Sequence, residues 1–519
     1  MACTTILVGR GATNDGSTLV ARNEDTGNGT FNSKKLVVIE PEDQPRIYTG
    51  VESHLTMELP DNPLRYMCTP NADPTGGVWG EAGINAANVC MSATETISSN
   101  ARVLGADPLI CYRPAKGKEG EPGYEPEQPG GIGEENLITI ILPYITSARD
   151  GVKRMGKLLE EYGTYEMNGV AFGDAKEVWY IETIGGHHWI ARRVPDDCYV
   201  AQPNRQGIDW FDLKDAFGEQ KDYMCSADLT RWMADNHLNM VFDPEDGTEL
   251  IDGIPAQFNP RFAFTSWTWL DTVYNDPRAW YIFREFNPTD ARFNGPNAIY
   301  GPESMNLPWC MKPEAKLSVM DIKNMLSTTY DGTIYNPYTD KKGTPDSRHR
   351  YRPIGINRTS ECSVLQIRGY APRAVQGVQW ISMGSGPFNT SVAMFSNVHQ
   401  VPAYFDTDPD EVTTENLYWA DRIIAAMADC EFFDNLEPLY NYQQECLTHG
   451  YTNLHKVDAI ATAQGARAED VDDKEIIATL EDVNAELTEY VKTQTNDLMK
   501  TVLYTRSYYM NNAFGASDH

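Results

Sequence analysis

Cys3-Thr4-Thr5-Ile6-Leu7-Val8-Gly9 opens the stretch that decides the fold, and Ala21-Arg22-Asn23-Glu24-Asp25 closes it. The β-branched, apolar run at 4–9 predicts a buried strand. Asn14-Asp15-Gly16-Ser17 predicts a turn, because Asn, Asp and Gly tolerate positive φ, and residues 18–25 form the return strand. This hairpin places a cysteine near the chain terminus inside a sheet, beside an arginine and two carboxylates.

The rest of the chain predicts sheets first, then helices, then sheets again. Residues 35–40 and 86–94 have strand character, and 134–162 has helical periodicity divided by Pro143. A second meander is predicted over the runs 169–173, 178–183, 189–193 and 199–202. This order is typical of a layered α+β fold and not of alternating βαβ units.

The C-terminal part has a different pattern. Long helices are predicted over residues 414–430, 435–450 and 474–508. We interpret 3–410 as one domain with loop insertions, including the Gly/Pro-rich stretch 117–133, and 411–519 as a helical appendage. The appendage is a candidate surface for a homo-oligomer.

Composition excludes several classes of protein. The 519 residues carry a formal net charge of −31, which disfavours binding to nucleic acid or to anionic membranes. No apolar run approaches the ~20 residues of a membrane helix, and the N-terminus lacks the pattern of a secretory signal. Ten scattered cysteines form no CxxC pair, so we expect a cytoplasmic protein without a zinc or disulfide scaffold.

Cys3 is the strongest candidate for chemistry. A thiol of pKa ~8.5 and an α-amine of pKa ~7.7–8.0 titrate close together, so an N-terminal cysteine can pass its proton to its own amine. The alternative is a buried structural cysteine. The near-terminal position, the apolar strand and the returning charges favour the nucleophile.

Arg22 and Asp25 form the charged part of this stretch. In an alternating strand the two side chains lie on opposite faces unless the strand bulges. An arginine near Cys3 favours the thiolate, and a carboxylate holds an ammonium group. The alternative is an exposed ion pair at the strand end.

Other motifs give no support for a cofactor or a metal. His187-His188 are adjacent on a strand and point to opposite faces, without HExxH or a second ligand group. GxGxxG and GxxxxGK[ST] sequences are absent after strands, so no nucleotide or other cofactor is expected.

The opening stretch resembles the C69 family of bacterial dipeptidases, which are N-terminal nucleophile hydrolases related to bile salt hydrolases and penicillin V acylases. Six later stretches are also similar to this family: Trp79-Gly80-Glu81-Ala82-Gly83-Ile84-Asn85, Met91-Ser92-Ala93-Thr94-Glu95-Thr96, Tyr162-Gly163-Thr164-Tyr165-Glu166, Trp179-Tyr180-Ile181-Glu182-Thr183, His187-His188-Trp189-Ile190-Ala191-Arg192-Arg193 and Arg352-Pro353-Ile354-Gly355-Ile356-Asn357-Arg358. The resemblance covers roughly residues 3–400. It implies a four-layer αββα core and a cysteine-type dipeptidase that hydrolyses the amide bond of dipeptides.

The resemblance implies a role for five residues. Cys3 matches the nucleophile, and Arg22 and Asp25 match the family's Arg-Asn-x-Asp pattern. Asn204 lies where an oxyanion-hole asparagine is expected, and Arg278 matches a later active-site arginine. A second oxyanion donor has no clear match, and Ser92, Thr94 or a backbone N–H are the alternatives.

One departure from the resemblance concerns Ala2. In many relatives the cysteine follows the initiator methionine directly, whereas here Ala2 intervenes and would cap the amine of Cys3. We therefore expect both Met1 and Ala2 to be removed before catalysis. Two other functions remain as alternatives: an acylase acting on a non-peptide amide, and a catalytically silent binding protein.

A dipeptide also has two charged termini for the site to recognise. From charge type alone, Asp25, Glu24 or Glu95 are the candidates for its ammonium group. Arg22 or Arg278 are the candidates for its carboxylate.

Overall fold

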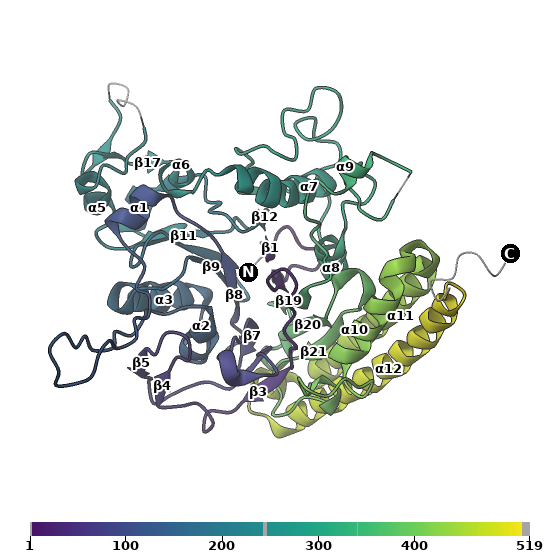
Figure 1. Cartoon of the computed structure of the whole chain (residues 1–519). Helices are drawn as coiled ribbons and strands as arrows, with labels where there is room; N and C mark the ends of the chain where they lie inside the picture. Colours follow the sequence, from purple (N-terminus) through teal and green to yellow (C-terminus); the bar gives the residue numbers. More distant parts are fainter. Residues whose placement is uncertain (1–2, 242–246, 340, 511–519) are drawn as a thin grey trace.

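The computed structural model describes residues 3–241, 247–339 and 341–510 (Figure 1). The predicted N-terminal hairpin is confirmed: β1 (Thr4–Val8) pairs antiparallel with β2 (Thr18–Asp25). Gly16 has φ of +84° in the turn, and Asp15 Oδ1 accepts a hydrogen bond from the backbone N–H of Ser17. The N-terminal segment is therefore part of a sheet from Thr4 onward.

This hairpin lies inside a seven-stranded antiparallel sheet of order β18-β12-β1-β2-β19-β20-β21. The other strands are β12 (Tyr199–Gln202), β18 (Cys310–Met311), β19 (Thr359–Ile367), β20 (Gly377–Met383) and β21 (Val392–Phe395). The strands beside the hairpin thus come from positions about 200 and 360, far away in the sequence.

A second antiparallel sheet has eight strands in the order β14-β11-β10-β9-β8-β7-β6-β3. They are β3 (Val37–Ile39), β6 (Tyr66–Cys68), β7 (Ala82–Asn85), β8 (Cys90–Thr96), β9 (Asn168–Gly173), β10 (Val178–Thr183), β11 (Trp189–Arg193) and β14 (Tyr223–Cys225). The strand predicted at 86–94 begins only at Cys90, because Asn88 has a φ of +59° in a turn that bonds back to Asn85.

The second meander differs from the prediction in its last strand. β9, β10 and β11 pair in sequence, but residues 199–202 leave this sheet and pair with β1. The turn at 195–198 carries the chain across, and Gly9 packs so closely on it that a Cβ at that position would lie 2.5 Å from the Pro195 carbonyl oxygen. Tyr199 and Ala201 then contribute to the core on the far side of the seven-stranded sheet.

The two sheets pack face to face around a shared core. Leu7, Val20 and Leu365 of the seven-stranded sheet meet Ile84 and Tyr180 of the eight-stranded sheet. Because side chains alternate along a strand, odd-numbered residues of β1 and even-numbered residues of β2 face this interior. The same alternation places Cys3 and Arg22 on the inner face.

Helices cover the outer face of each sheet (Figure 1). α2 (Glu134–Ile141) and α3 (Ala148–Tyr162) pack on the eight-stranded sheet, and a short 3₁₀ turn containing Pro143 separates them as predicted. α8 (Val319–Ser327), α10 (Leu417–Ala428), α11 (Phe432–Gln464) and α12 (Lys474–Ser507) pack on the seven-stranded sheet. The fold is therefore of the α+β class with antiparallel sheets.

The C-terminal helices share a continuous core with the sheet they cover. Leu480 and Val491 of α12 belong to the same cluster as Ile6 and Val8 of β1. α11 does not end at Gly450 as the sequence predicts; there, a Cβ would lie 3.1 Å from the Trp380 ring, so this glycine permits close helix–sheet packing. A domain boundary at 410/411 stays a prediction.

The remaining elements complete the fold, and one of them, α7 (Asp276–Phe286), packs against β12 of the seven-stranded sheet. They are α1 (Ala101–Ala106), α4 (Leu213–Phe217), α5 (Leu229–Asp235), α6 (Pro260–Phe264), α7, α9 (Pro345–Arg348) and three two-stranded sheets formed by β4 (Ile47–Thr49) with β5 (Thr56–Glu58), β13 (Phe211–Asp212) with β17 (Gln257–Phe258), and β15 (Leu250–Ile251) with β16 (Ile254–Pro255). A dark blue arm ahead of α2 projects from the body in Figure 1 and includes the predicted loop 117–133. Within the described residues, no helix is both long and apolar enough to cross a membrane.

Candidate active site

Cys3 lies at the start of β1 and is fully buried between the two sheets. Its sulfur accepts a hydrogen bond of 3.1 Å from Nη1 of Arg22, whose strand runs alongside. Thr5, two residues further on the same face, donates to Glu95 of β8 at 2.7 Å. The first strand therefore presents its thiol to charged groups of both sheets. Met1 and Ala2, whose removal the sequence predicts, lie outside the described residues.

Arg22 is the most heavily bonded side chain near the sulfur. Its five N–H groups all have acceptors, which are Cys3 Sγ, Ser92 Oγ, the carbonyl oxygens of Ala93 and Thr94, and Glu81 Oε2. Its guanidinium is thus fixed in position against β8. No N–H group of Arg22 remains for a substrate carboxylate.

The electrostatic environment of Cys3 favours the neutral thiol. Burial raises the pKa of Cys3, the charge of Arg22 opposes this rise, and the carboxyl groups of Glu95 and Glu134 add to it. A buried thiol of this kind becomes a nucleophile only if a nearby base takes its proton.

Asp25 lies at the end of β2, on the face opposite to Arg22, as the alternation of the strand predicts. Its carboxylate accepts a 2.5 Å hydrogen bond from Thr359 Oγ1 and forms an ion pair with Arg352. All three side chains are buried. Among the described contacts, Arg22 bonds to the sulfur of Cys3, whereas Asp25 holds Arg352.

Arg278 links Asn204, the candidate oxyanion donor, to the backbone of Cys3. Its Nη1 donates to the carbonyl oxygen of Cys3 and, at 2.9 Å, to Thr4 Oγ1. Its Nη2 donates to Oδ1 of Asn204 at 2.9 Å and to Oδ1 of Asn275 at 2.8 Å. Asn204 lies just beyond β12, the strand beside β1. The structure therefore brings Asn204 and Arg278 to the same end of β1 as Cys3.

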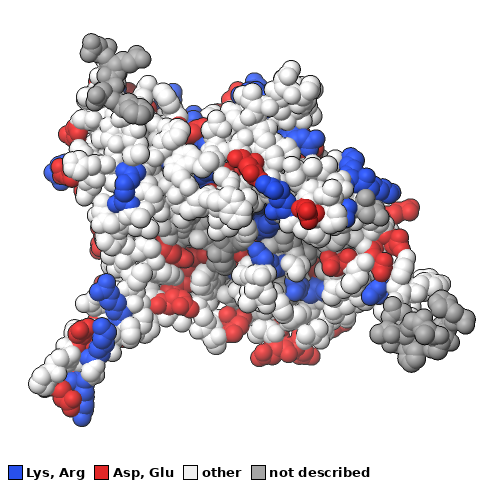
Figure 2. All heavy atoms as spheres, turned by 45° about the horizontal axis from the view of Figure 1, so that its top comes forward, with Lys and Arg blue, Asp and Glu red and all other residues white. Residues whose placement is uncertain are grey.

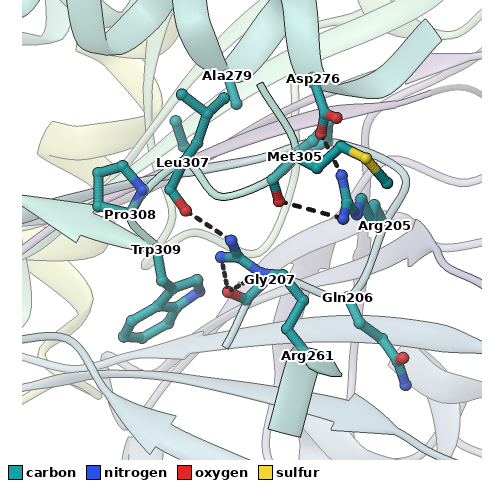
Figure 3. Close-up of a pocket in the computed structure, with 12 residues that line it drawn as sticks. Arg205, Gln206, Gly207, Arg261, Asp276, Ala279, Met305, Leu307, Pro308 and Trp309 are labelled. Atoms are coloured by element: carbon teal, nitrogen blue, oxygen red, sulfur yellow. Dashed lines mark hydrogen bonds and ion pairs between the residues drawn. The ribbon is translucent and has the colours of Figure 1, made fainter. Parts of the chain in front are cut away.

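A second arginine supports the loop that carries Asn204 (Figure 3). Arg205 Nη1 lies 2.5 Å from Asp276 Oδ1 on the first turn of α7, and the Nδ2 of Asn275 donates to the Asn204 carbonyl at 3.0 Å. Figure 3 also shows Arg261 bonding to the carbonyls of Gly207 and Leu307. These contacts fix the loop at 204–207 onto the helix of Arg278.

His187 and His188 both contact the carboxylate of Asp107. The Nδ1 atoms of both histidines contact the two oxygens of Asp107, at 2.9 and 2.7 Å, and His188 stacks on Trp232. In the part of the chain that the structure describes, no cluster of three or more ligand side chains could hold a metal ion.

The sequence did not single out three of the charged groups that surround the site. Glu81 pairs with Arg22, Glu134 reaches it from the first residue of α2, and Arg352 holds Asp25. Glu81 and Arg352 lie within stretches that carry the family resemblance, but the sequence assigned neither of them a role. Glu134 gave no signal, because its approach depends on how α2 packs on β8.

The site therefore has a buried cysteine between the two packed sheets with an arginine at its sulfur. Comparisons with known proteins show the family: residues 2–445 match peptidase family C69, and the chain belongs to that family. The chain is therefore a peptidase.

Two of the similar curated proteins align with the chain from end to end. A protein named dipeptidase from Bifidobacterium longum is 48% identical, with 100% of both chains aligned. A protein named probable dipeptidase A from Streptococcus pyogenes serotype M3 is 46% identical, again over 100% of both chains. Dipeptidase A of Lactobacillus helveticus is 40% identical over 88% of each chain.

Proposed function

We propose that the chain is a cysteine-type dipeptidase in which Cys3, once it is the N-terminal residue, is the nucleophile and its own α-amine is the base. The observation that carries this proposal is the position of Cys3, which is buried at the start of a central strand with Arg22 at its sulfur. The family and the names of the relatives supply the substrate class.

The architecture is consistent with this mechanism. Helices, two face-to-face sheets and further helices follow one another, and we propose that they form the four-layer αββα sandwich of N-terminal nucleophile hydrolases. In such a sandwich, the nucleophile lies at the end of a strand between the sheets. Cys3 has that position here.

The proposed reaction begins with cleavage of the Ala2–Cys3 peptide bond, which frees the α-amine of Cys3. The amine takes the thiol proton, directly or through water, and the thiolate attacks the carbonyl carbon of the dipeptide. Arg22 stabilises the thiolate, because a cation beside the sulfur favours its charged form.

Asn204 then stabilises the tetrahedral intermediate. Because Arg278 holds Oδ1 of Asn204, the amide nitrogen is the group that donates to the oxyanion, together with a backbone N–H. The ammonium group of Cys3 protonates the leaving amine as the C–N bond breaks. Water then hydrolyses the thioester, which releases the N-terminal amino acid of the dipeptide and returns the proton to the thiol.

The unpaired cysteines are consistent with a reducing compartment. None of the ten cysteines forms a disulfide, and six of them are buried. We propose a cytoplasmic enzyme acting on dipeptides.

Intact-mass measurement and activity assays together test this proposal. We expect purified protein to begin at Cys3 and to hydrolyse dipeptides, and a matched chain with Ala2 deleted to behave in the same way. Cys3→Ala should abolish activity in both. Full activity in Cys3→Ala, or full activity in a chain that retains Ala2 on Cys3, would overturn the mechanism. Cleavage of N-acyl amides in place of dipeptides would indicate an acylase.

A further inference from the structure

Glu134, the first residue of α2, extends its carboxylate into the Cys3 site. Its Oε1 accepts a 3.3 Å hydrogen bond from the backbone N–H of Thr94 and lies 3.8 Å from Nη1 of Arg22. The same Nη1 donates to the Cys3 sulfur at 3.1 Å. The Glu134 carboxylate is therefore separated from the nucleophile by a single guanidinium nitrogen.

The second oxygen of this carboxylate has no partner among the described residues. Glu134 is 1% exposed, and its Oε2 is buried without a hydrogen bond. Oγ1 of Thr94, whose own N–H bonds Glu134, is also buried and unpartnered. Unpartnered buried acceptors destabilise a fold, so their presence points to a ligand that donates hydrogen bonds. An ammonium group offers three donors and no acceptor.

The charges around Glu134 also favour a cation. Buried carboxyl groups outnumber the two buried cations Arg22 and Lys34 at this end of the site; they belong to Glu24, Glu81, Glu134 and Glu361. Burial raises the pKa of Glu134 well above its ordinary value, and the charges of Glu81 and Glu166 raise it further. A positive group bound beside Glu134 would restore the ionised carboxylate.

Of the other carboxylates near the site, Glu81, Glu24 and Asp25 each pair with a cation, whereas Glu361 also has an unpartnered oxygen. Glu24 pairs with Lys34 at 3.0 Å, and Asp25 pairs with Arg352. Glu95 also has one unpartnered oxygen, and burial raises its pKa to about 7, but the charges of Arg278, Arg22 and Arg352 all oppose this rise. Among the described residues, the charged groups that act on Glu134 are by contrast one cation, Arg22, and two carboxylates, Glu81 and Glu166.

We propose that Glu134 binds the α-ammonium group of the substrate, with Thr94 Oγ1 as a second acceptor, so that the site selects dipeptides with a free N-terminus. The inference rests on the proposed dipeptidase function and deepens it. Arg278 bonds the Cys3 carbonyl, and its five N–H groups all have neutral acceptors, so its charge, and not a free N–H group, is what would attract the substrate carboxylate.

Binding measured without turnover tests Glu134 separately from the mechanism. All chains in this experiment carry Cys3→Ala and lack Ala2, so they bind without hydrolysis. Calorimetry measures the affinity for four dipeptides with different side chains and for the N-acetyl derivative of each. We expect the tightest free dipeptide to bind at least tenfold more tightly than its N-acetyl form. Glu134→Gln should abolish this preference by weakening the free dipeptide alone, and Glu134→Asp should retain part of it because the charge remains.

Glu135→Gln is the matched control, because this neighbouring buried carboxylate accepts hydrogen bonds from the backbone N–H groups of residues 51–53. It should leave the preference intact. Three outcomes would overturn the inference. Glu134→Gln could weaken the binding of the free and the N-acetyl dipeptide equally, or Glu95→Gln could abolish the preference in place of Glu134→Gln. The parent chain could also bind the two ligands equally well. If the enzyme that retains Cys3 does not hydrolyse dipeptides, while the binding preference for a free N-terminus is intact, the proposed function alone is refuted.

Discussion

The Nη1 atom of Arg22 lies 3.1 Å from the sulfur of Cys3, and the same guanidinium pairs with Glu81. Cys3 and Arg22 come from the two strands of one hairpin, so the chain needs only a turn to bring them together. The remaining N–H groups of Arg22 bond to β8 of the other sheet. The arginine therefore fixes the cysteine relative to both sheets.

Arg22→Lys tests this relationship. A lysine has three N–H donors in place of five, and it cannot bond both the sulfur and the carbonyls of β8. We expect the pKa of the Cys3 thiol to rise further, and kcat/KM on a dipeptide to fall by about 10²-fold. The rate of Cys3 alkylation by iodoacetamide, followed by mass spectrometry, measures the first effect.

Arg10→Lys is the control for this substitution, because Arg10 is exposed and pairs with Asp196 at the surface. It should change neither the alkylation rate nor the activity. Unchanged alkylation and activity in Arg22→Lys would show that the contact with the sulfur has no effect on the thiol.

Asp25→Asn tests the buried pair with Arg352. The substitution breaks the buried ion pair with Arg352, and removing one partner of a buried ion pair costs about 3–5 kcal/mol in proteins. We expect urea denaturation to show a loss of that order in the free energy of unfolding. Asp61→Asn, at a side chain that is 99% exposed, should change it by less than about 0.5 kcal/mol. A loss no larger than that in Asp25→Asn would mean that the pair contributes little.

Local patterns predicted the hairpin and the place of Arg22, because strand alternation and turn chemistry act over a few residues. They also predicted that Asp25 lies on the other face. The partner of strand 199–202 was predicted wrongly, because pairing depends on contacts distant in sequence. Gly450 was read as a helix end, whereas it packs on Trp380 from a strand 70 residues earlier.

The candidate site shows the same limit. Cys3, Arg22 and Asn204 could be proposed from the residues and the resemblance, and the structure places all three at one end of β1. The carboxylate of Glu134 could not be proposed, because no sequence motif records which helix residue faces β8 after packing.

The pH dependence of stability should report Glu182. Burial raises its pKa from 4.5 to about 7, although two backbone N–H groups bond to it. The folded state then binds more protons than the unfolded chain between pH 4.5 and 7, so stability falls as pH rises through this window. Relative to Glu182→Gln, the wild type should lose up to about 3 kcal/mol between pH 4 and 8.

Urea denaturation at several pH values measures this difference. Glu119→Gln, in the exposed arm, controls for the removal of a surface carboxylate. A difference between wild type and Glu182→Gln that stays constant with pH would contradict the raised pKa.

A double-mutant cycle on Asn204 and Arg278 tests the last link of the proposed mechanism. Arg278 donates to Oδ1 of Asn204 at 2.9 Å and to the Cys3 carbonyl, so it orients the amide relative to the nucleophile. Asn204→Ala should lower kcat by about 10²–10³-fold with a smaller change in KM, because an oxyanion donor acts in the transition state. Arg278→Lys should lower kcat through the misplaced amide. If Arg278 acts through Asn204, adding Arg278→Lys to Asn204→Ala should lower kcat by less than it does in the wild type. Fully multiplicative losses would show that the two residues act independently, and an unchanged kcat in Asn204→Ala would exclude Asn204 as the oxyanion donor.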